Sequence, residues 1–269
     1  MILASASLLS LVLGGAASAA YALPAAAAAR LGPRGARGAL LVAWLFHALL
    51  LAWGLLGTDP RFGWAPALSV TAWLVVTVYA VESQFFPQLE PRLALATLGA
   101  IAVLLALLYP GNPLHATASP WWALHTALGI ASYGLFAAAV VHAWLMRRAE
   151  KQIRLAADPQ SGMPLLTLER LTFRFVMAGF VLLSATLLAG WLFSENLVGN
   201  GGASGWKWDH KTVFSILSWI VFAVLLIGRT RFGWRGRRAR RVLYAGAVLL
   251  LLAYVGSRFV LEVVLGRAT

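Results

Sequence analysis

Long apolar segments dominate this chain and restrict what it can fold into. A helix needs about 20 apolar residues to cross the hydrocarbon core of a bilayer. Eight such segments can be traced, near residues 2–26, 38–57, 66–84, 93–109, 121–146, 173–196, 212–228 and 241–264. We therefore predict an all-α fold, a polytopic membrane helical bundle of about eight transmembrane helices.

The composition agrees with this class and limits the number of domains. The chain has 269 residues, of which 61% are hydrophobic and 12% are charged, and its mean hydropathy is +0.79. Eight spans of about 20 residues use most of the apolar content and leave only short loops. We expect one integral-membrane domain over residues 1–269. The first apolar segment lacks a basic region before its core, so we interpret it as a retained span instead of a signal peptide.

The basic residues predict the orientation in the membrane. The first, third, fifth and seventh loops between the apolar segments hold 17 of the 22 Lys and Arg residues. By the positive-inside rule these loops are cytoplasmic, and both termini lie outside. The net charge of +13 therefore reflects topology, and we expect the lipid bilayer and no nucleic acid as a partner. The predicted location is the bacterial inner membrane, with the loop before residue 210 on the periplasmic side.

A polar and aromatic cluster stands between the sixth and seventh apolar segments. The run 205–211 reads Gly-Trp-Lys-Trp-Asp-His-Lys and follows a stretch rich in Gly. Trp206 and Trp208 could stack on a flat ring, while lysines beside the positive end of a helix could hold its carboxylates. Asp209 is also a natural N-cap for the seventh span. The alternative is an aromatic belt with basic flanks, which most membrane proteins possess.

A second candidate site lies near the predicted outer start of the fifth span. His125 has Trp122 at i−3, Gly129 at i+4 and Tyr133 at i+8, roughly on one helical face. An imidazole beside a ring, a gap and a phenol would accommodate the edge of a flat macrocycle. The alternative is a histidine at headgroup level that is hydrogen bonded to water or to a loop carbonyl.

Two histidines fall deeper in the predicted spans. His47 is near the middle of the second span, and His142 is near the cytoplasmic end of the fifth. They are possible intramembrane ligands, and a neutral histidine bonded to a serine or a backbone carbonyl is the alternative. His125 and His142 are 17 residues apart, about 100° off a common helical face, so a deeper site would pair His47 with His142.

The sequence contains no pattern that indicates catalysis. Cysteine is absent, which excludes disulfides, thiol exchange and thiolate metal sites. No nucleophile elbow, phosphate-binding glycine loop, HExxH motif or paired-carboxylate constellation is present. We therefore assign no catalytic residues and do not expect an enzyme.

Three segments resemble the cytochrome c assembly protein family, whose members handle haem in bacterial and organellar membranes. Residues 206–209, Trp-Lys-Trp-Asp, are similar to the family's tryptophan-rich haem-handling motif. Leu124-His125 with Ser132-Tyr133 resembles the segment that bears an external haem-ligating histidine. Residues 168–174 resemble the segment that enters the next span. The resemblance covers residues 120–260, and residues 254–260 look most like the short YpjD/HemX-like branch.

The resemblance implies a haem-binding inner-membrane protein that supports cytochrome c assembly or haem handling, with other cytochrome assembly or haem-pathway membrane proteins as partners. His125 would be an axial ligand of the haem iron, and Trp206, Trp208 and Asp209 would form the ring platform. Trp122 and Tyr133 would lie beside the haem.

One segment departs from the family pattern. Full haem-delivery members carry a second external histidine in the stretch that corresponds to residues 256–262, which here has none. His210 is the nearby candidate for a replacement ligand. The departure keeps two alternatives open, namely an accessory or transporter-associated membrane subunit that retains the fold without haem binding, and a regulator of haem biosynthesis.

Overall fold

The described part of the chain contains eight apolar helical segments, in the order expected from the sequence. The computed structural model describes residues 8–26, 32–57, 59–85, 92–113, 120–154, 165–192 and 209–264. Six of the helices in these ranges are long and apolar enough to cross a membrane, and two shorter apolar helices are Leu8–Leu23 and Leu93–Leu108. The prediction of a membrane helical bundle is confirmed, while the count of eight spans and the outward termini remain predictions.

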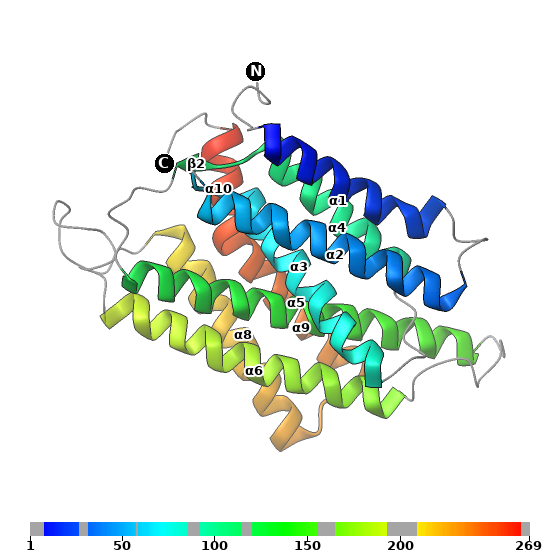
Figure 1. Cartoon of the computed structure of the whole chain (residues 1–269). Coiled ribbons are helices and arrows are strands. Elements are labelled where there is room, and N and C mark those ends of the chain that lie inside the picture. Colours follow the sequence, from blue (N-terminus) through cyan, green and yellow to red (C-terminus); the bar gives the residue numbers. More distant parts are fainter. Residues whose placement is uncertain are drawn as a thin grey trace. The chain divides into compact units, whose positions relative to one another are not determined.

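The chain forms two compact units, and each is described by itself. Unit 1 comprises Met1–Leu114 with the last two residues, and unit 2 comprises His115–Arg267. The helices of unit 1 are α1 (Leu8–Ala26), α2 (Pro33–Leu56), α3 (Trp64–Phe85) and α4 (Arg92–Leu108) (Figure 1). The short strands β1 (Arg61–Phe62) and β2 (Asn112–Pro113) pair antiparallel, so the connection after α2 is joined to the segment after α4.

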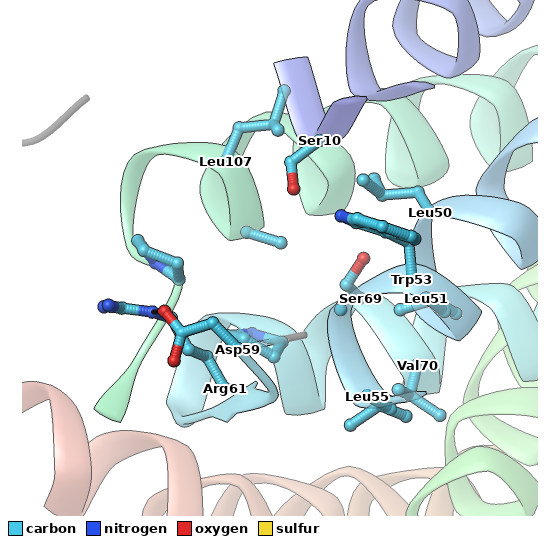
Figure 2. A pocket seen from close by; sticks show the side chains of 14 residues that line it. Ser10, Leu50, Leu51, Trp53, Leu55, Asp59, Arg61, Ser69, Val70 and Leu107 are labelled. Atoms are coloured by element: carbon cyan, nitrogen blue, oxygen red, sulfur yellow. Dashed lines mark hydrogen bonds and ion pairs between the residues drawn. The ribbon is translucent and has the colours of Figure 1, made fainter. Parts of the chain in front are cut away.

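Polar as well as apolar contacts join the helices of unit 1. Trp44 of α2 stacks on Trp73 of α3 with ring centroids 5.4 Å apart, and its Nε1 donates to Thr77 Oγ1 at 2.7 Å. Helices in lipid associate through close packing and hydrogen bonds, because lipid is as apolar as their side chains. The helices of unit 1 also surround a pocket of about 120 Å³ (Figure 2).

Unit 2 holds the second half of the bundle. It contains α5 (Pro120–Arg154), α6 (Leu165–Leu192), α8 (His210–Phe232) and α9 (Gly236–Leu251). The last helix continues as a π-helical stretch, Leu252–Gly256, then α10 (Ser257–Phe259) and a second π-helical stretch, Val260–Val264. Helices α5 and α6 lie side by side, and α8 packs against both α6 and α9 (Figure 1).

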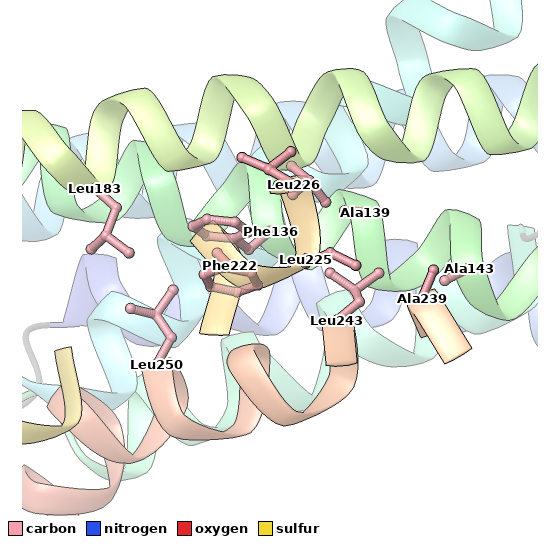
Figure 3. Packing of buried hydrophobic residues seen from close by; sticks show 11 residues of the cluster. Phe136, Ala139, Ala143, Leu183, Phe222, Leu225, Leu226, Ala239, Leu243 and Leu250 are labelled. Atoms are coloured by element: carbon pink, nitrogen blue, oxygen red, sulfur yellow. The ribbon is translucent and has the colours of Figure 1, made fainter. Parts of the chain in front are cut away.

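Aromatic stacking fills the core of unit 2. Phe136 of α5 and Phe222 of α8 stack with ring centroids 3.7 Å apart and planes within 6° (Figure 3). Both rings are almost completely buried among aliphatic residues of α6, α8 and α9. A Cβ on Gly246 of α9 would stand 2.7 Å from the Phe222 ring, so only glycine permits this approach of α9 to α8.

Two helices extend beyond the apolar segments that the sequence delimits. The prediction placed residues 147–172 in a cytoplasmic loop, yet α5 continues to Arg154 and α6 begins at Leu165. Hydropathy marks the part of a helix that can lie in lipid, and charged turns beyond it remain helical because Arg, Lys, Glu and Leu are good helix formers. The basic residues of this predicted loop therefore lie on helix ends wherever the structure describes them.

Candidate functional site

The N-terminal end of α5, which is predicted to face the outside, carries the candidate haem ligand His125. His125 is half-buried, and its imidazole lies against the backbone of Thr186 in α6. Its Nδ1 is buried and has no hydrogen-bond partner in the parts of the chain that the structure describes. A Cβ built on Gly129, one turn further, would lie 3.6 Å from the Thr186 methyl group. Thr186 of α6 therefore lies next to both the imidazole and Gly129.

Tyr133 links α5 to the last helix. Its hydroxyl donates a hydrogen bond to the carbonyl oxygen of Leu250, and its phenol also lies close to the backbone of Tyr254. Leu250 lies two residues before the start of the π-helical stretch Leu252–Gly256. Single π-helical turns inside α-helices occur frequently at functional sites. The face of α5 that holds His125 therefore continues into a contact with an irregular part of the last helix.

Asp209 begins α8 as the sequence predicts. Its backbone is extended, and its side chain accepts a hydrogen bond from the Thr212 N–H at 2.9 Å. The next residue, His210, is exposed in the first turn. Lys211 places its ammonium 5.9 Å from the centroid of the Tyr254 ring, within cation–π range. The N-terminus of α8 thus lies beside the same part of the last helix that Tyr133 reaches.

Of the remaining predicted site residues, the structure describes only some. Trp122 is half-buried in the first turn of α5. Trp206 and Trp208 lie outside the described residues and precede the capping Asp209 by three positions and one position. Within the described ranges, no three His, Asp or Glu side chains gather as a metal-binding cluster. A metal at this end of unit 2 would therefore rely on fewer than three described His, Asp or Glu side chains and on the group that carries the metal.

The two deeper histidines, His47 and His142, are hydrogen bonded to hydroxyl groups or to a backbone carbonyl, as expected for histidines that do not bind a metal. In unit 1, His47 Nδ1 is 3.1 Å from the Tyr21 hydroxyl, and its Nε2 is 2.8 Å from Ser69 Oγ. In unit 2, His142 Nδ1 donates to the Ala138 carbonyl at 2.8 Å. For His47 to bind a metal, one of its two hydrogen bonds would have to break. The pairing of His47 with His142 remains a prediction that joins two separate units.

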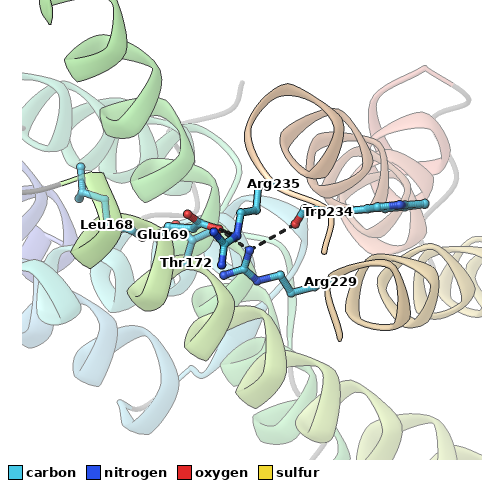
Figure 4. Close-up of polar contacts among 6 residues, drawn as sticks. All are labelled: Leu168, Glu169, Thr172, Arg229, Trp234 and Arg235. Carbon is cyan, nitrogen blue, oxygen red and sulfur yellow. Dashed lines mark hydrogen bonds and ion pairs between the residues drawn. The ribbon is translucent and has the colours of Figure 1, made fainter. Parts of the chain in front are cut away.

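An ion cluster at the far end of α8 was not predicted. Arg229 Nη1 is 2.5 Å from Glu169 Oε1 of α6, and Arg235 Nε is 3.5 Å from the same oxygen (Figure 4). Arg229 also lies over the Phe173 ring, 4.6 Å from its centroid, and donates to the Trp234 carbonyl at 3.4 Å. About 19 residues of helix separate this cluster from His210, roughly 29 Å along α8. It therefore fixes α8 against α6 and takes no part in the candidate site.

The sequence could not reveal the partners that complete the site. Thr186, Leu250 and Tyr254 come from helices 60 to 130 residues away along the chain from the α5 residues that they contact. A hydrogen bond such as Tyr133 to Leu250, across 117 positions, leaves no periodic signal in one sequence. The α5 residues were found because i, i+4 and i+8 share a helical face.

Comparison with known proteins identifies the family. The family described as Cytochrome C assembly protein matches residues 37–265, which include both units. The chain belongs to the cytochrome c assembly family. The chain is accordingly a multi-pass membrane protein of this family, and the resemblance inferred from residues 120–260 is confirmed.

Several known proteins are similar to this chain. An inner membrane protein YpjD of Escherichia coli (strain K12) is 36% identical over 152 residues, and the match spans 56% of this chain and 56% of that protein. A 28.8 kDa protein of Azospirillum brasilense is 32% identical over 247 residues, or 83% of this chain and 87% of that protein. The cytochrome c biogenesis protein CcsA of Prochlorococcus marinus (strain MIT 9312) is 25% identical over 242 residues. The match covers 78% of this chain and 76% of that protein. No solved structure matches the chain.

The cap of α8 gives a first testable prediction for this family member. Replacing Asp209 with alanine should lower the free energy of unfolding by about 1 kcal/mol, because the Thr212 N–H loses its acceptor. Chemical unfolding of the purified protein in detergent measures the change. Asp209→Asn is the matched control, because asparagine caps equally well without the charge. Equal destabilisation by both variants would contradict a capping role.

Proposed function

We propose that this protein binds haem at the end of unit 2 formed by the N-termini of α5 and α8, and thereby supports cytochrome c assembly or haem handling. The observation that carries the proposal is the buried Nδ1 of the half-buried His125, which has no hydrogen-bond partner among the described residues. Buried polar atoms are normally hydrogen bonded, so an orphaned imidazole nitrogen calls for an explanation. An axial bond to haem iron would supply the missing partner.

The surroundings of His125 support this role. Metal-bound histidines usually hold their second ring nitrogen on a carbonyl or carboxylate, which fixes the tautomer and the ring orientation. The contact of the imidazole with the Thr186 backbone is of this kind. Gly129 faces the Thr186 methyl group on the same side of α5, and Tyr133 lies one turn further, bonded to Leu250. Haem itself would supply the iron and its redox chemistry, while the protein would bind and orient it.

The start of α8 would hold the carboxylates and the ring. A helix N-terminus attracts anions, and Lys211 adds a positive charge in the first turn. Trp206 and Trp208, next to the cap in sequence, would stack on the macrocycle. By the charge distribution of the loops, this end of unit 2 would face the periplasm from the inner membrane. His210 is the candidate for the second axial position.

The test is the visible spectrum of the purified full-length protein titrated with haem. We expect a Soret band for the native protein, and His125→Gln should weaken haem binding at least about 100-fold, since loss of an outer-shell partner alone costs 10–100-fold. His142→Gln, on the same helix, is the matched control and should bind normally because His142 is held by Ala138. Absence of the band, or a band that His125→Gln leaves unchanged, would contradict the proposal.

Residues 256–262 depart from the family pattern and favour a second candidate function. Since that stretch has no histidine, a membrane accessory subunit that keeps the fold without haem binding is the second candidate. It predicts no Soret band and intact c-type cytochromes after deletion of the gene. A regulator of haem biosynthesis would instead change the abundance of a biosynthetic enzyme in the same deletion strain.

A further inference from the structure

A pocket in unit 1 has a built lining that the haem proposal does not use. Its volume is about 120 Å³, and each of the four helices of the unit contributes to it (Figure 2). Ser10 comes from α1, Trp53 and Gly54 from α2, Ser69 from α3 and Leu107 from α4. The connections that carry β1 and β2 close the same end of the unit. The pocket thus lies near one end of the four helices.

The lining selects an uncharged ligand. Most lining side chains are apolar, and Trp53 offers an aromatic wall. Asp59 and Arg61 are the two charged residues of the lining, and they form an ion pair of 2.9 Å with each other. Because their charges cancel, the lining carries no surplus charge for a phosphate or carboxylate group. Pockets of this composition bind mostly apolar molecules whose few polar atoms meet specific groups.

Ser69 is one of the two serines in the pocket wall, and two further residues lie behind it. Its hydroxyl is directed toward the space beside Trp53 (Figure 2). Ser69 Oγ is 2.8 Å from His47 Nε2, and His47 Nδ1 is 3.1 Å from the Tyr21 hydroxyl. His47 and Ser69 have no exposed surface, and Tyr21 retains 1%. The three side chains form a buried chain of hydrogen bonds that ends at the pocket.

The neutral imidazole allows this chain two arrangements. In one, Nε2–H donates to Ser69, Tyr21 donates to Nδ1, and the serine hydroxyl can donate to a carbonyl in the pocket. In the other, Nδ1–H donates to Tyr21, Ser69 donates to Nε2, and the serine oxygen can accept from a hydroxyl. The same site can therefore bind a molecule that exchanges a carbonyl for a hydroxyl.

We propose that this pocket binds an isoprenoid quinone in both its quinone and quinol forms. The ring would lie beside Trp53 with an oxygen at Ser69, and the apolar tail would follow the aliphatic walls toward the bilayer. Such a molecule is uncharged, dissolves in lipid and exchanges carbonyl oxygens for hydroxyls, which are the three properties that the lining selects. The proposal is independent of haem binding, since the two sites share no residue.

The experiment measures equilibrium binding of a radiolabelled short-chain menaquinone to the full-length protein in phosphatidylcholine nanodiscs. Gly54 lines the pocket, and a Cβ there would meet no atom within 4 Å, so Gly54→Leu adds side-chain volume at the lining. We expect it to weaken binding at least about tenfold, because the added side chain competes with the ring for volume. Gly38→Leu, on the same helix and equally unobstructed, is outside the lining and should change affinity less than about twofold.

A second variant tests the hydroxyl. Ser69→Ala should weaken binding of both the quinone and the quinol about two- to tenfold, the range for loss of one hydrogen bond. Thermal unfolding of each variant verifies that it is folded. Absence of saturable binding, or equal affinities for Gly54→Leu and Gly38→Leu, would overturn the proposal. So would labelling of the pocket by a photoactivatable phosphatidylcholine that excess menaquinone does not displace, because an acyl chain would then be the occupant.

Discussion

Replacing Phe222 with alanine is expected to lower the free energy of unfolding by about 3–5 kcal/mol. The ring is fully buried, stacks on Phe136 at 3.7 Å and fills the space that Gly246 leaves between α8 and α9. Removing a buried aromatic ring forfeits its contacts and leaves a cavity that rigid helices cannot close. Unfolding in a mixed-micelle denaturant series, monitored by circular dichroism, measures the loss.

Phe232→Ala supplies the control on the same helix. Phe232 is 73% exposed near the end of α8, so its truncation should cost less than about 0.5 kcal/mol. Similar losses for the two variants would show that the stack does not organise unit 2. Helix α8 also carries the proposed haem-binding end, which begins at the capping Asp209. Loosening the packing around α8 should therefore weaken the binding of any ligand at that end. Haem affinity of Phe222→Ala should therefore fall although Phe222 lies in the hydrophobic core.

The fold class could be predicted from the sequence because each helix must carry its own apolar stretch through lipid. The charged turns at 147–154 and 165–172 were assigned to a loop, since hydropathy reports the solvent around a helix and not its length. The boundary between the two compact units leaves no comparable signal. It depends on which helices pack together, and apolar segments resemble one another in composition.

The candidate site was partly predictable for the same physical reason. His125, Gly129 and Tyr133 share a face because of helical periodicity, and the capping role of Asp209 follows from its residue type and position. Their partners Thr186 and Leu250 lie on other helices and have no local pattern. His47 illustrates the limit, because its sequence position fits a ligand and a structural residue equally well. The structure distinguishes the two roles, because it shows His47 hydrogen bonded to Tyr21 and Ser69.

Replacing Glu169 with glutamine is expected to destabilise the protein by about 1.5–3 kcal/mol. Glu169 is 12% exposed and neutralises Arg229, which is 22% exposed and lies over Phe173. Removing one partner of a largely buried pair leaves the other charge in a poorly solvated place. Unfolding in the same denaturant series gives the magnitude, and higher ionic strength should reduce it only slightly because the pair is shielded from solvent.

A double-mutant cycle separates the two arginines that share this carboxylate. Coupling between Glu169→Gln and Arg229→Gln should be about 1–2 kcal/mol, because the pair is short and mostly buried. Coupling with Arg235→Gln should stay below about 0.5 kcal/mol, because that side chain is 66% exposed and 3.5 Å away. Equal couplings would mean that the carboxylate acts only through the summed charge of the region. Unequal couplings would instead make Arg229 the residue that anchors the end of α8 to α6, opposite the end where ligand binding is proposed.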